Sequence, residues 1–541
     1  MIQSFNYAVG QGIVNGIESI SPIEITTPSG KEMVITLANI MIDKPNVPCS
    51  SGKGNILDSR LFPRQCIESG TTYKSSLSAT IEFCYKHSRS SGTVKQSLGY
   101  LPIMVRSNLC NLHGLNPADL VACGEDLNNP GGYFIINGSK KILRLLTAQR
   151  RNYPIAISRD TWKQKQKDFT DKGILLTSVA KDETTTTNVL HYLNTGYAKL
   201  EFFVNKRPFI IDLVIMLKAF KDINDRELVR TCLAMRGNDT FFIEKIKEML
   251  TDLASQKLFT SSQCQEYIGK SFRPVVKEFV PDWFTDVDVC NLLLEKYVFI
   301  HLNDKESKFN FLCSIACKLY AYIAGEAVTE SLDVTSMMEA HLSGFLYLKY
   351  LKEKLQDMLT SIKWLTIAKM KSEEIDYVLN DADFRKICTR TRKVGPDMES
   401  MVTTGNLSSR TGIGLNQQTG LSVVLEGLNR MRDLSHLRAI HRGSYFIEMK
   451  TVLPRRLTGE AWGFICPVHT PDGAPCGLLN HLAYNCTIPA HPPAHDEALF
   501  VKSALKMLGM VSMSTELVLS GALFYCNNCN NCQWPILPSF P

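Results

Sequence analysis

Apolar residues recur at every third or fourth position in three long stretches of the chain. The clearest stretch lies within residues 336–367 and contains LYLKYLKEKLQDMLTSIKWL; those from Asp225 to Leu258 and from Lys308 to Ile323 have the same spacing. This period brings apolar side chains to one face of an α-helix. We therefore expect amphipathic helices in all three stretches.

Strand patterns occupy other parts of the chain. Residues 21–42, SPIEITTPSGKEMVITLANIMI, predict two strands joined around Pro28–Gly30, and residues 78–105 are also strand-like. The run GGYFIING (Gly131–Gly138) predicts a short buried strand flanked by turns, because glycine stands at both ends. After that strand we expect a helical turn that leads to the pair Arg150–Arg151.

The order of these patterns indicates how the chain is divided. After Pro154 strands dominate from Leu175 to Ile215, and helical stretches follow. This order predicts a domain inserted between two parts of an α+β domain. The segment from Arg438 to Leu482 is rich in Gly, Pro and cationic residues, so we expect a shaped loop system there rather than a regular core element.

The composition is typical of a globular protein with several domains. Hydrophobic residues make up 44% of the 541 positions and charged residues 21%, which is enough chain for three or four separate cores. No apolar run approaches the ~18 residues that span a bilayer, and the N-terminus lacks a signal-peptide pattern, so we expect no membrane contact. The 17 cysteines are scattered and odd in number, which favours a reducing intracellular compartment.

Positive charge is concentrated in one segment. Between Arg385 and Arg456 there are 13 Lys or Arg residues and five Asp or Glu residues, a surplus larger than the net charge of +7 of the whole chain. A basic segment on a nearly neutral body suggests one surface that faces an anion. The alternative is a solvated basic face without a partner.

The residues that could carry chemistry form no complete active site or metal site. Cys466, His469, Cys476 and His481 lie near zinc spacing, but rigid Pro and Gly turns separate them. The carboxylate pairs Asp286/Asp288 and Asp381/Asp383 are better interpreted as residues of helix caps or loops than as magnesium ligands. The series Cys526, Cys529 and Cys532 has no fourth ligand nearby, and no phosphate-binding glycine loop is present. We therefore predict no catalytic residue and no metal ligand.

Anion binding remains as the candidate chemistry of the basic segment. Arginine suits this role because its planar guanidinium matches phosphate oxygens and base edges. If the turn that contains Arg438 and Arg442 is helical, both guanidinium groups project from one side, and its neighbours Leu434 and Leu437 face the core. The alternative is internal pairing with Asp397, Glu426, Asp433 or Glu448. The predicted nucleic-acid-binding residues are Arg410, Arg438, His441, Arg442, Arg455 and Arg456.

Three motifs resemble the second-largest, β-like subunit of multisubunit DNA-directed RNA polymerases. They are GGYFIINGSKKILRLLTAQRRNYP (131–154), SHLRAIHRG (435–443) and WGFICPVHTPDGAPCGLLNHL (462–482), and they occur in the family's order. The RRNYP run and TGNLSSRTGIGLNQQTGL (404–421) are similar to the RNA polymerase I form of this subunit. Ile67 stands where the family usually has arginine.

The resemblance implies an α+β, multidomain architecture. It assigns residues 1–154 and 331–384 to a protrusion, 155–330 to an inserted lobe, 385–485 to a fork, and 486–541 to the start of an external domain with an atypical end. Trp462, Pro467, Pro471 and Gly473 are then scaffold residues that fix the fork by packing and turn geometry.

The resemblance also implies a function. The chain is expected to serve in RNA polymerase I, which makes the ribosomal RNA precursor in the nucleolus of the nucleus. Its partners are the largest subunit, the other subunits, the DNA template and the RNA–DNA hybrid. Mg²⁺ is held mainly by the largest subunit, and the family's zinc site lies in a C-terminal half that this chain does not contain. The alternatives are a truncated, non-catalytic nucleic-acid-binding or assembly module and an incomplete gene product.

Overall fold

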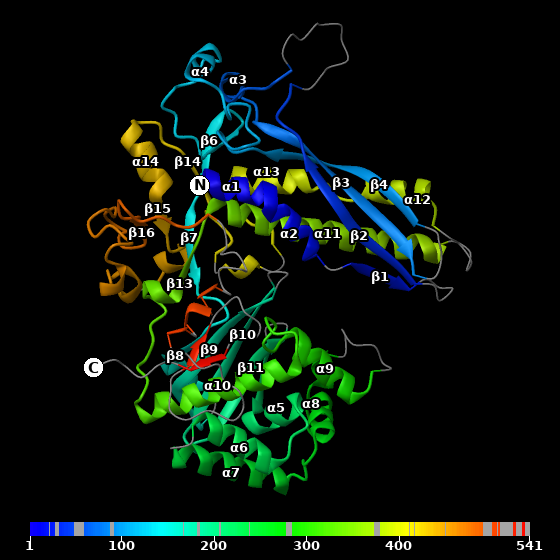
Figure 1. Ribbon diagram of the computed structural model, residues 1–541, viewed down its shortest axis with the longest axis vertical. Helices are drawn as coiled ribbons and strands as arrows, with labels where there is room; N and C mark the ends of the chain where they lie inside the picture. Colours follow the sequence, from blue (N-terminus) through cyan, green and yellow to red (C-terminus); the bar gives the residue numbers. More distant parts are fainter. Residues whose placement is uncertain are drawn as a thin grey trace. The chain divides into compact units, whose positions relative to one another are not determined.

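The chain forms two compact units, shown as a computed structural model in Figure 1. Unit 1 comprises Met1–Ala148 and Met338–Pro492, and unit 2 comprises Gln149–Met337 and Pro493–Pro541. Most of unit 2 is therefore inserted in sequence between the two parts of unit 1. The structure describes residues 1–20, 22–26, 32–47, 59–86, 91–165, 167–180, 184–204, 207–236, 239–276, 284–372, 379–409, 412–415, 417–449, 451–490, 500–501, 503–505, 507–508, 523–525 and 533–535.

A four-stranded antiparallel sheet forms one side of the unit 1 core. Its strands, in spatial order, are β1 (Ile23–Thr26), β2 (Glu32–Ile42), β3 (Lys74–Tyr85) and β4 (Ser91–Pro102). Burial alternates along β3, so that Leu77, Ile81 and Phe83 point into the core. The two strands predicted within residues 21–42 are confirmed, and the turn at Pro28–Gly30 lies outside the described residues.

Helices pack against this sheet (Figure 1). Gly395 allows α13 to approach β4, because an added Cβ would lie 2.4 Å from the backbone nitrogen of Tyr100. The predicted long amphipathic helix is confirmed as α11, although it begins at Ser343 rather than Ser336. The helices of unit 1 are α1 (Ile2–Tyr7), α2 (Ile13–Glu18), α3 (Pro63–Glu68), α4 (Pro117–Ala122), α11 (Ser343–Ser372), α12 (Asp381–Arg390), α13 (Val394–Thr404) and α14 (Arg430–Arg438).

Two small sheets complete unit 1. The first has the order β14-β6-β5 and the second the order β13-β7-β15-β16. The buried strand predicted in GGYFIING is confirmed as β5, but the helical turn expected before Arg150 is wrong, because β6 and β7 occupy that segment. The strands are β5 (Phe134–Ile136), β6 (Ser139–Leu143), β7 (Leu145–Gln149), β13 (Met338–His341), β14 (Ser422–Val424), β15 (Ala439–His441) and β16 (Leu479–His481).

Unit 2 is built on a five-stranded antiparallel sheet in the order β12-β11-β10-β9-β8. The strand pattern predicted from Leu175 to Ile215 is confirmed up to Asp212, and helix α5 (Leu213–Phe220) follows. The strands are β8 (Pro154–Ser158), β9 (Phe169–Val179), β10 (Thr185–Leu193), β11 (Ala198–Val204) and β12 (Arg207–Asp212). Near the C-terminus, β17 (Leu523–Tyr525) and β18 (Gln533–Pro535) pair as a two-stranded antiparallel sheet.

Helices enclose the core of unit 2. Every residue of α5 is buried, and α10 packs along β8, β9 and β10. The helices predicted after Asp225 and Lys308 are confirmed. Within the described residues, no helix combines the length and the apolar character needed to cross a bilayer. The helices are α5 (Leu213–Phe220), α6 (Asp225–Met235), α7 (Thr240–Ser255), α8 (Ser261–Val276), α9 (Asp286–Lys296) and α10 (Lys305–Ala324).

The two carboxylate pairs lie in the first turns of helices, which confirms their interpretation as cap residues. Asp288 completes a capping box with Thr285 at α9, and Asp286 pairs with Arg273 at 2.6 Å. Asp383 donates its backbone N–H to the side chain of Asn380, the N-cap of α12. These carboxylates therefore stabilise helix N-termini.

Candidate nucleic-acid interface

Residues 438–482, which we call the basic loop segment, form turns held between β15 and β16. The backbone N–H of Leu482 donates to the oxygen of Arg438 at 3.0 Å, and the N–H of Arg442 donates to the oxygen of Leu478 at 2.9 Å. The Thr470 hydroxyl also joins two parts of the loop, because it accepts from Gly477 N–H and donates to the Leu479 oxygen, both at 2.9 Å. Short 3-10 turns lie at Ser444–Ile447, Leu453–Arg455 and Gly459–Ala461. The predicted shaped loop is thus confirmed.

Arg438 is held inside this structure. It ends α14, and the chain becomes strand β15 at Ala439, so Arg438 and Arg442 do not share one helical face. This corrects the helical interpretation of the turn. The Arg438 guanidinium donates to three carbonyl oxygens, at 2.5 Å for Ala483 and 3.2 Å for both Tyr484 and Cys486. Arg438 therefore stabilises the exit of the loop.

Leu434, in contrast, is 39% exposed and does not face the core as expected, whereas Leu437 packs against the core of unit 1. The helix α14 has no fully buried residue. Its arginine Arg432 pairs with Glu426 at 2.8 Å. The alternative prediction, that arginines of the basic segment pair with nearby carboxylates, is therefore confirmed for Arg432.

His441 is buried and uncharged at neutral pH. Its Nδ1 atom accepts a hydrogen bond from the Gly443 N–H at 2.8 Å. Burial, and then the charge of Arg144, lowers the pKa of the imidazole to about 4. His441 therefore shapes the turn as a neutral acceptor.

Arg442 and Arg455 also contact their own loop. One nitrogen of the Arg442 guanidinium donates to the Pro454 oxygen at 3.2 Å, and the group lies 4.6 Å from the centre of the Phe446 ring. Arg455 donates to the oxygens of Ala474 and Cys476, at 2.6 and 2.8 Å. Arginine is thus used here to close a loop that has few regular backbone hydrogen bonds.

Two cations differ from these. Arg456 is exposed, and its guanidinium has no hydrogen bond or ion pair within the described part of the chain. Arg144 lies between β6 and β7 and is half-buried, and burial lowers the pKa of its guanidinium. Its charge also contributes to lowering the pKa of His436 and of His441. Among the described residues, no acceptor for the Arg144 side chain is found.

The sequence patterns did not lead us to predict Arg144 as a binding residue. The position of Arg410 is not described. Arg144 stands in the motif at residues 131–154, where its position directly after an apolar strand pattern, KKIL, was the available signal. Arg410 lies outside the described residues.

The four Cys and His residues with zinc-like spacing do not converge. His469 and His481 stack with ring centres 3.4 Å apart, and the Nε2 atoms of both rings face the Ser435 hydroxyl, at 3.4 and 3.1 Å. No group of three metal-ligating side chains occurs in the described ranges. Cys526, Cys529 and Cys532 lie outside these ranges.

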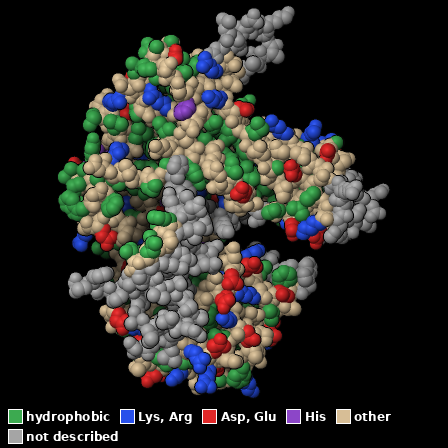
Figure 2. Space-filling model, in the orientation of Figure 1, with side chains coloured by type: hydrophobic (Ala, Val, Ile, Leu, Met, Phe, Trp, Pro, Cys, Tyr) green, Lys and Arg blue, Asp and Glu red, His purple; other side chains and the backbone are tan. Residues whose placement is uncertain are grey.

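Apolar side chains are exposed on the basic loop segment. Trp462 is 64% exposed, which contradicts its expected role in packing, although Gly473 has the positive φ of 82° expected of a tight turn. Figure 2 shows hydrophobic side chains gathered over this loop region, at the left edge of the view. Exposed apolar surface of this kind marks an interaction site. Its further members are Val452, Leu453, Phe464, Val468 and Tyr484.

Comparison with known proteins identifies the class to which this fold and loop segment belong. Residues 1–390 match the family described as RNA polymerase beta subunit, and residues 423–488 match RNA polymerase Rpb2, domain 3. The chain therefore belongs to the RNA polymerase beta-subunit family, which confirms the resemblance of its motifs and its α+β, multidomain fold class.

The relatives are named as subunits of DNA-directed RNA polymerase I. The chain is 35% identical to DNA-directed RNA polymerase I subunit RPA2 of Drosophila melanogaster over 97% of the chain and 46% of that protein. It is 37% identical to the same subunit of Homo sapiens over 90% of the chain and 42% of the relative. The chain spans about half the length of the curated relatives it matches.

Proposed function

We propose that this chain serves as part of the second-largest subunit of DNA-directed RNA polymerase I. That enzyme would copy a DNA template into the ribosomal RNA precursor from nucleoside triphosphates, in the nucleolus. The observation that carries this proposal is the alignment of 97% of the chain with the relative from Drosophila melanogaster, which is named as an RNA polymerase I subunit. The order of the three motifs supports it.

The proposed domains follow from this role. Residues 1–154 and 331–384 would form the protrusion, 155–330 the lobe, 385–485 the fork, and 486–541 the start of an external domain. The inserted segment Gln149–Met337 of unit 2 begins and ends within seven residues of the proposed lobe, which supports that division.

We assign nucleic-acid contacts to two cations, Arg456 of the fork and Arg144 of the protrusion. Arg456 is proposed to bind a backbone phosphate, because it is exposed and its guanidinium makes no hydrogen bond or ion pair within the described residues. Arg144 would bind an anionic group at the junction of β6 and β7, where a hydrogen-bonded partner would offset the cost of its burial. Arg438, His441, Arg442 and Arg455 would shape the surface. Arg410 stays a candidate for backbone contact.

A matched pair of neighbours tests this assignment. DNA binding by the full chain is measured by fluorescence anisotropy at several salt concentrations. Arg456→Ala should weaken binding and reduce the slope of log K against log salt by about 0.9, because one phosphate contact is lost. Arg455→Ala should instead lower thermal stability, and an unchanged slope for Arg456→Ala would reject the contact.

Magnesium chemistry would depend on another subunit. The carboxylate pairs of this chain cap helices, and no three metal ligands converge within the described residues. These residues do not fit a two-metal site. We therefore expect the purified chain to fail to extend an RNA primer on a DNA template in the presence of Mg²⁺, and template-dependent extension by the chain alone would contradict this.

The exposed apolar side chains of the basic loop segment support a role within an assembly. The proposed partners are the largest subunit and other polymerase subunits. Affinity purification of the tagged full chain from nuclear extract, followed by mass spectrometry, should recover the largest subunit of RNA polymerase I. Recovery of only the RNA polymerase II or III subunit, or of no largest subunit, would overturn the proposal.

A second candidate function is a non-catalytic assembly or nucleic-acid-binding module. It is favoured by the exposed cation Arg456 and the exposed apolar side chains of the basic loop segment, which could bind partners without a catalytic residue. The same purification separates the two, since a module of this kind would bind DNA with the salt dependence described above but would not be recovered with the largest polymerase subunit.

A further inference from the structure

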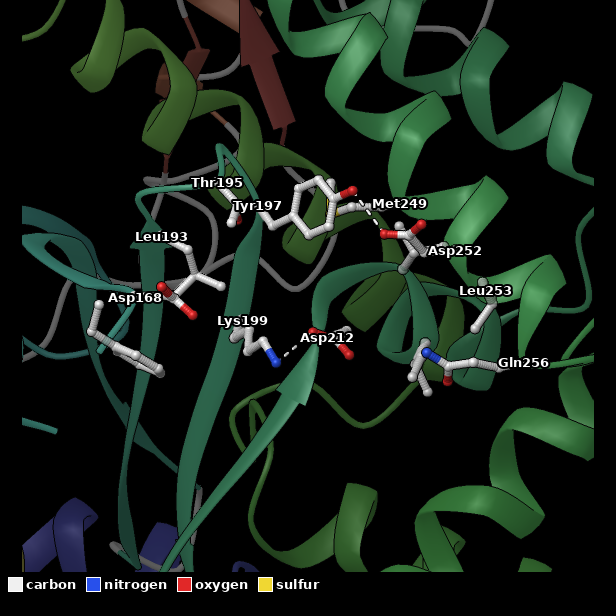
Figure 3. A pocket seen from close by; sticks show the side chains of 13 residues that line it. Asp168, Leu193, Thr195, Tyr197, Lys199, Asp212, Met249, Asp252, Leu253 and Gln256 are labelled. Atoms are coloured by element: carbon white, nitrogen blue, oxygen red, sulfur yellow. Dashed lines mark hydrogen bonds and ion pairs between the residues drawn. The ribbon is translucent and has the colours of Figure 1, made fainter. Parts of the chain in front are cut away.

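Unit 2 contains a pocket that neither the family nor the relatives' names assign. It has a volume of about 270 Å³ and opens between the edge of the sheet, at β11 and β12, and helix α7 (Figure 3). Its apolar lining comes from Phe169, Leu193, Val214, Ile215, Met249 and Leu253. Pockets for drug-sized ligands begin near 300 Å³, so this one suits a single side chain.

The rim of the pocket is acidic. Asp168, Asp212 and Asp252 contribute carboxylates and Lys199 one ammonium, which leaves a formal charge of minus two. Figure 3 shows Asp168 on one side of the pocket, Asp252 on the other, and the Lys199–Asp212 pair between them. The rim therefore favours a cation.

Two of the three carboxylates are already engaged. Lys199 pairs with Asp212 at 3.1 Å, and the Tyr197 hydroxyl donates to Asp252 at 2.7 Å, which raises the pKa of Tyr197 to about 12. Asp212 precedes α5 but makes no side-chain cap bond, so it does not serve the helix end.

Asp168 differs from the other two. Its backbone oxygen accepts from Asn194 N–H at 2.9 Å. Its carboxylate is exposed to solvent and has neither a donor nor a cation within the described ranges. A lysine side chain fits such a site, because its apolar methylene groups can lie in the cavity while its ammonium group binds the carboxylate.

We propose that this pocket binds a lysine side chain presented by a peptide segment of another protein. The four methylene groups would lie against Leu193, Val214 and Met249. The ammonium group would donate to the Asp168 carboxylate. A divalent cation fits less well, because no three ligating side chains converge in the part of the chain that the structure describes.

The test observes Met249 by NMR in the full chain. Methionine methyl groups are labelled with ¹³C, and the Met249 signal is assigned with Met249→Leu. The probe is acetyl-Gly-Ser-Lys-Ser-Gly-amide, in a phosphate buffer free of amines, and the control probe carries Nε-acetyl-lysine. The lysine peptide should shift the Met249 signal to saturation, and the acetylated peptide should not.

Two variants with equal changes in charge localise the binding. Asp168→Asn should weaken binding of the peptide about two- to fivefold, since it removes a solvent-exposed ion pair. Asp222→Asn, which removes an exposed carboxylate outside the pocket, should leave the affinity unchanged. The other methionine signals report that each variant is folded.

Three results would overturn the proposal. They are an equal shift with the acetylated peptide, an unchanged affinity in Asp168→Asn, and a Met249 shift that appears with MgCl₂ but with neither peptide. The proposal does not depend on the polymerase function, because the test uses neither nucleic acid nor another subunit.

Discussion

Arg438 illustrates how the charge of a single residue can be used within the fold. Its guanidinium serves three carbonyl oxygens of Ala483, Tyr484 and Cys486, and its removal leaves them without that donor. We expect Arg438→Ala to lower the free energy of unfolding in urea by about 1–3 kcal/mol. Arg456→Ala should change it by less than about 0.5 kcal/mol; equal stability of the two variants would contradict this difference.

His441 predicts a dependence of stability on pH. Burial lowers its pKa from 6.5 to about 4 in the folded chain, so the unfolded chain binds more protons between these values. Stability is therefore fully present above pH 6.5 and is lost as the pH falls through this window. The loss attributable to His441 is at most about 3 kcal/mol.

The variant His441→Asn tests this. Its side-chain oxygen can accept the Gly443 N–H but does not titrate. In thermal denaturation between pH 7 and pH 5, the variant should lose less stability than the unmodified chain. Parallel pH profiles of the two proteins would show that His441 does not contribute.

At the scale of elements, glycine determines how closely α13 approaches β4. A Cβ at Gly395 would lie 2.4 Å from the Tyr100 nitrogen and 2.6 Å from its oxygen, and backbone atoms cannot move aside cheaply. Gly395→Ala should destabilise the chain by about 1–3 kcal/mol in urea denaturation. Gly427→Ala has open space around the new methyl group and should be nearly neutral. If both are neutral, the close packing of α13 on β4 is not essential.

The regular elements could be predicted because their patterns are local. The alternation in β3 and the apolar period in α11 each reflect one buried face, whereas α10 is buried on all sides from Phe311 to Cys317. The junction at Arg438–Ala439 could not be predicted, since the chain becomes a strand there by pairing Ile440 with Leu145, far away in sequence. Local spacing contains no information on such a partner.

The candidate site was predictable only as a segment. The positive surplus between Arg385 and Arg456 covers α13, α14 and much of α12 as well as the start of the basic loop segment, and adjacent residues of the same type differ in their contacts. Arg455 reaches the oxygens of Ala474 and Cys476, whereas Arg456 is exposed. The path of the loop decides which arginine contacts carbonyl oxygens and which is exposed. The burial of Arg144 also depends on the folded arrangement and not on the local sequence.

At the scale of the whole molecule, the two units have separate cores. Leu77 belongs to the core of unit 1 and Leu293 to that of unit 2, and both are fully buried. Replacing either leucine with alanine should lower the free energy of unfolding of its unit by about 2–5 kcal/mol. Calorimetry of the full chain should show two transitions, with Leu77→Ala lowering one and Leu293→Ala the other; a single transition shifted by both would contradict independent cores.

The ends of the inserted segment are joined within unit 2 itself. The backbone N–H of Arg150 donates to the oxygen of Met337 at 3.0 Å, so the chain leaves unit 2 beside the point where it enters. For unit 1, an unfolded insert of this length is a loop whose closure costs about 4–5 kcal/mol of chain entropy. Once unit 2 has folded, the closure entropy has already been lost. The two parts of unit 1 then start from chain ends that lie close together. We therefore expect that a short flexible linker in place of unit 2 would also let the two remaining parts of unit 1 meet.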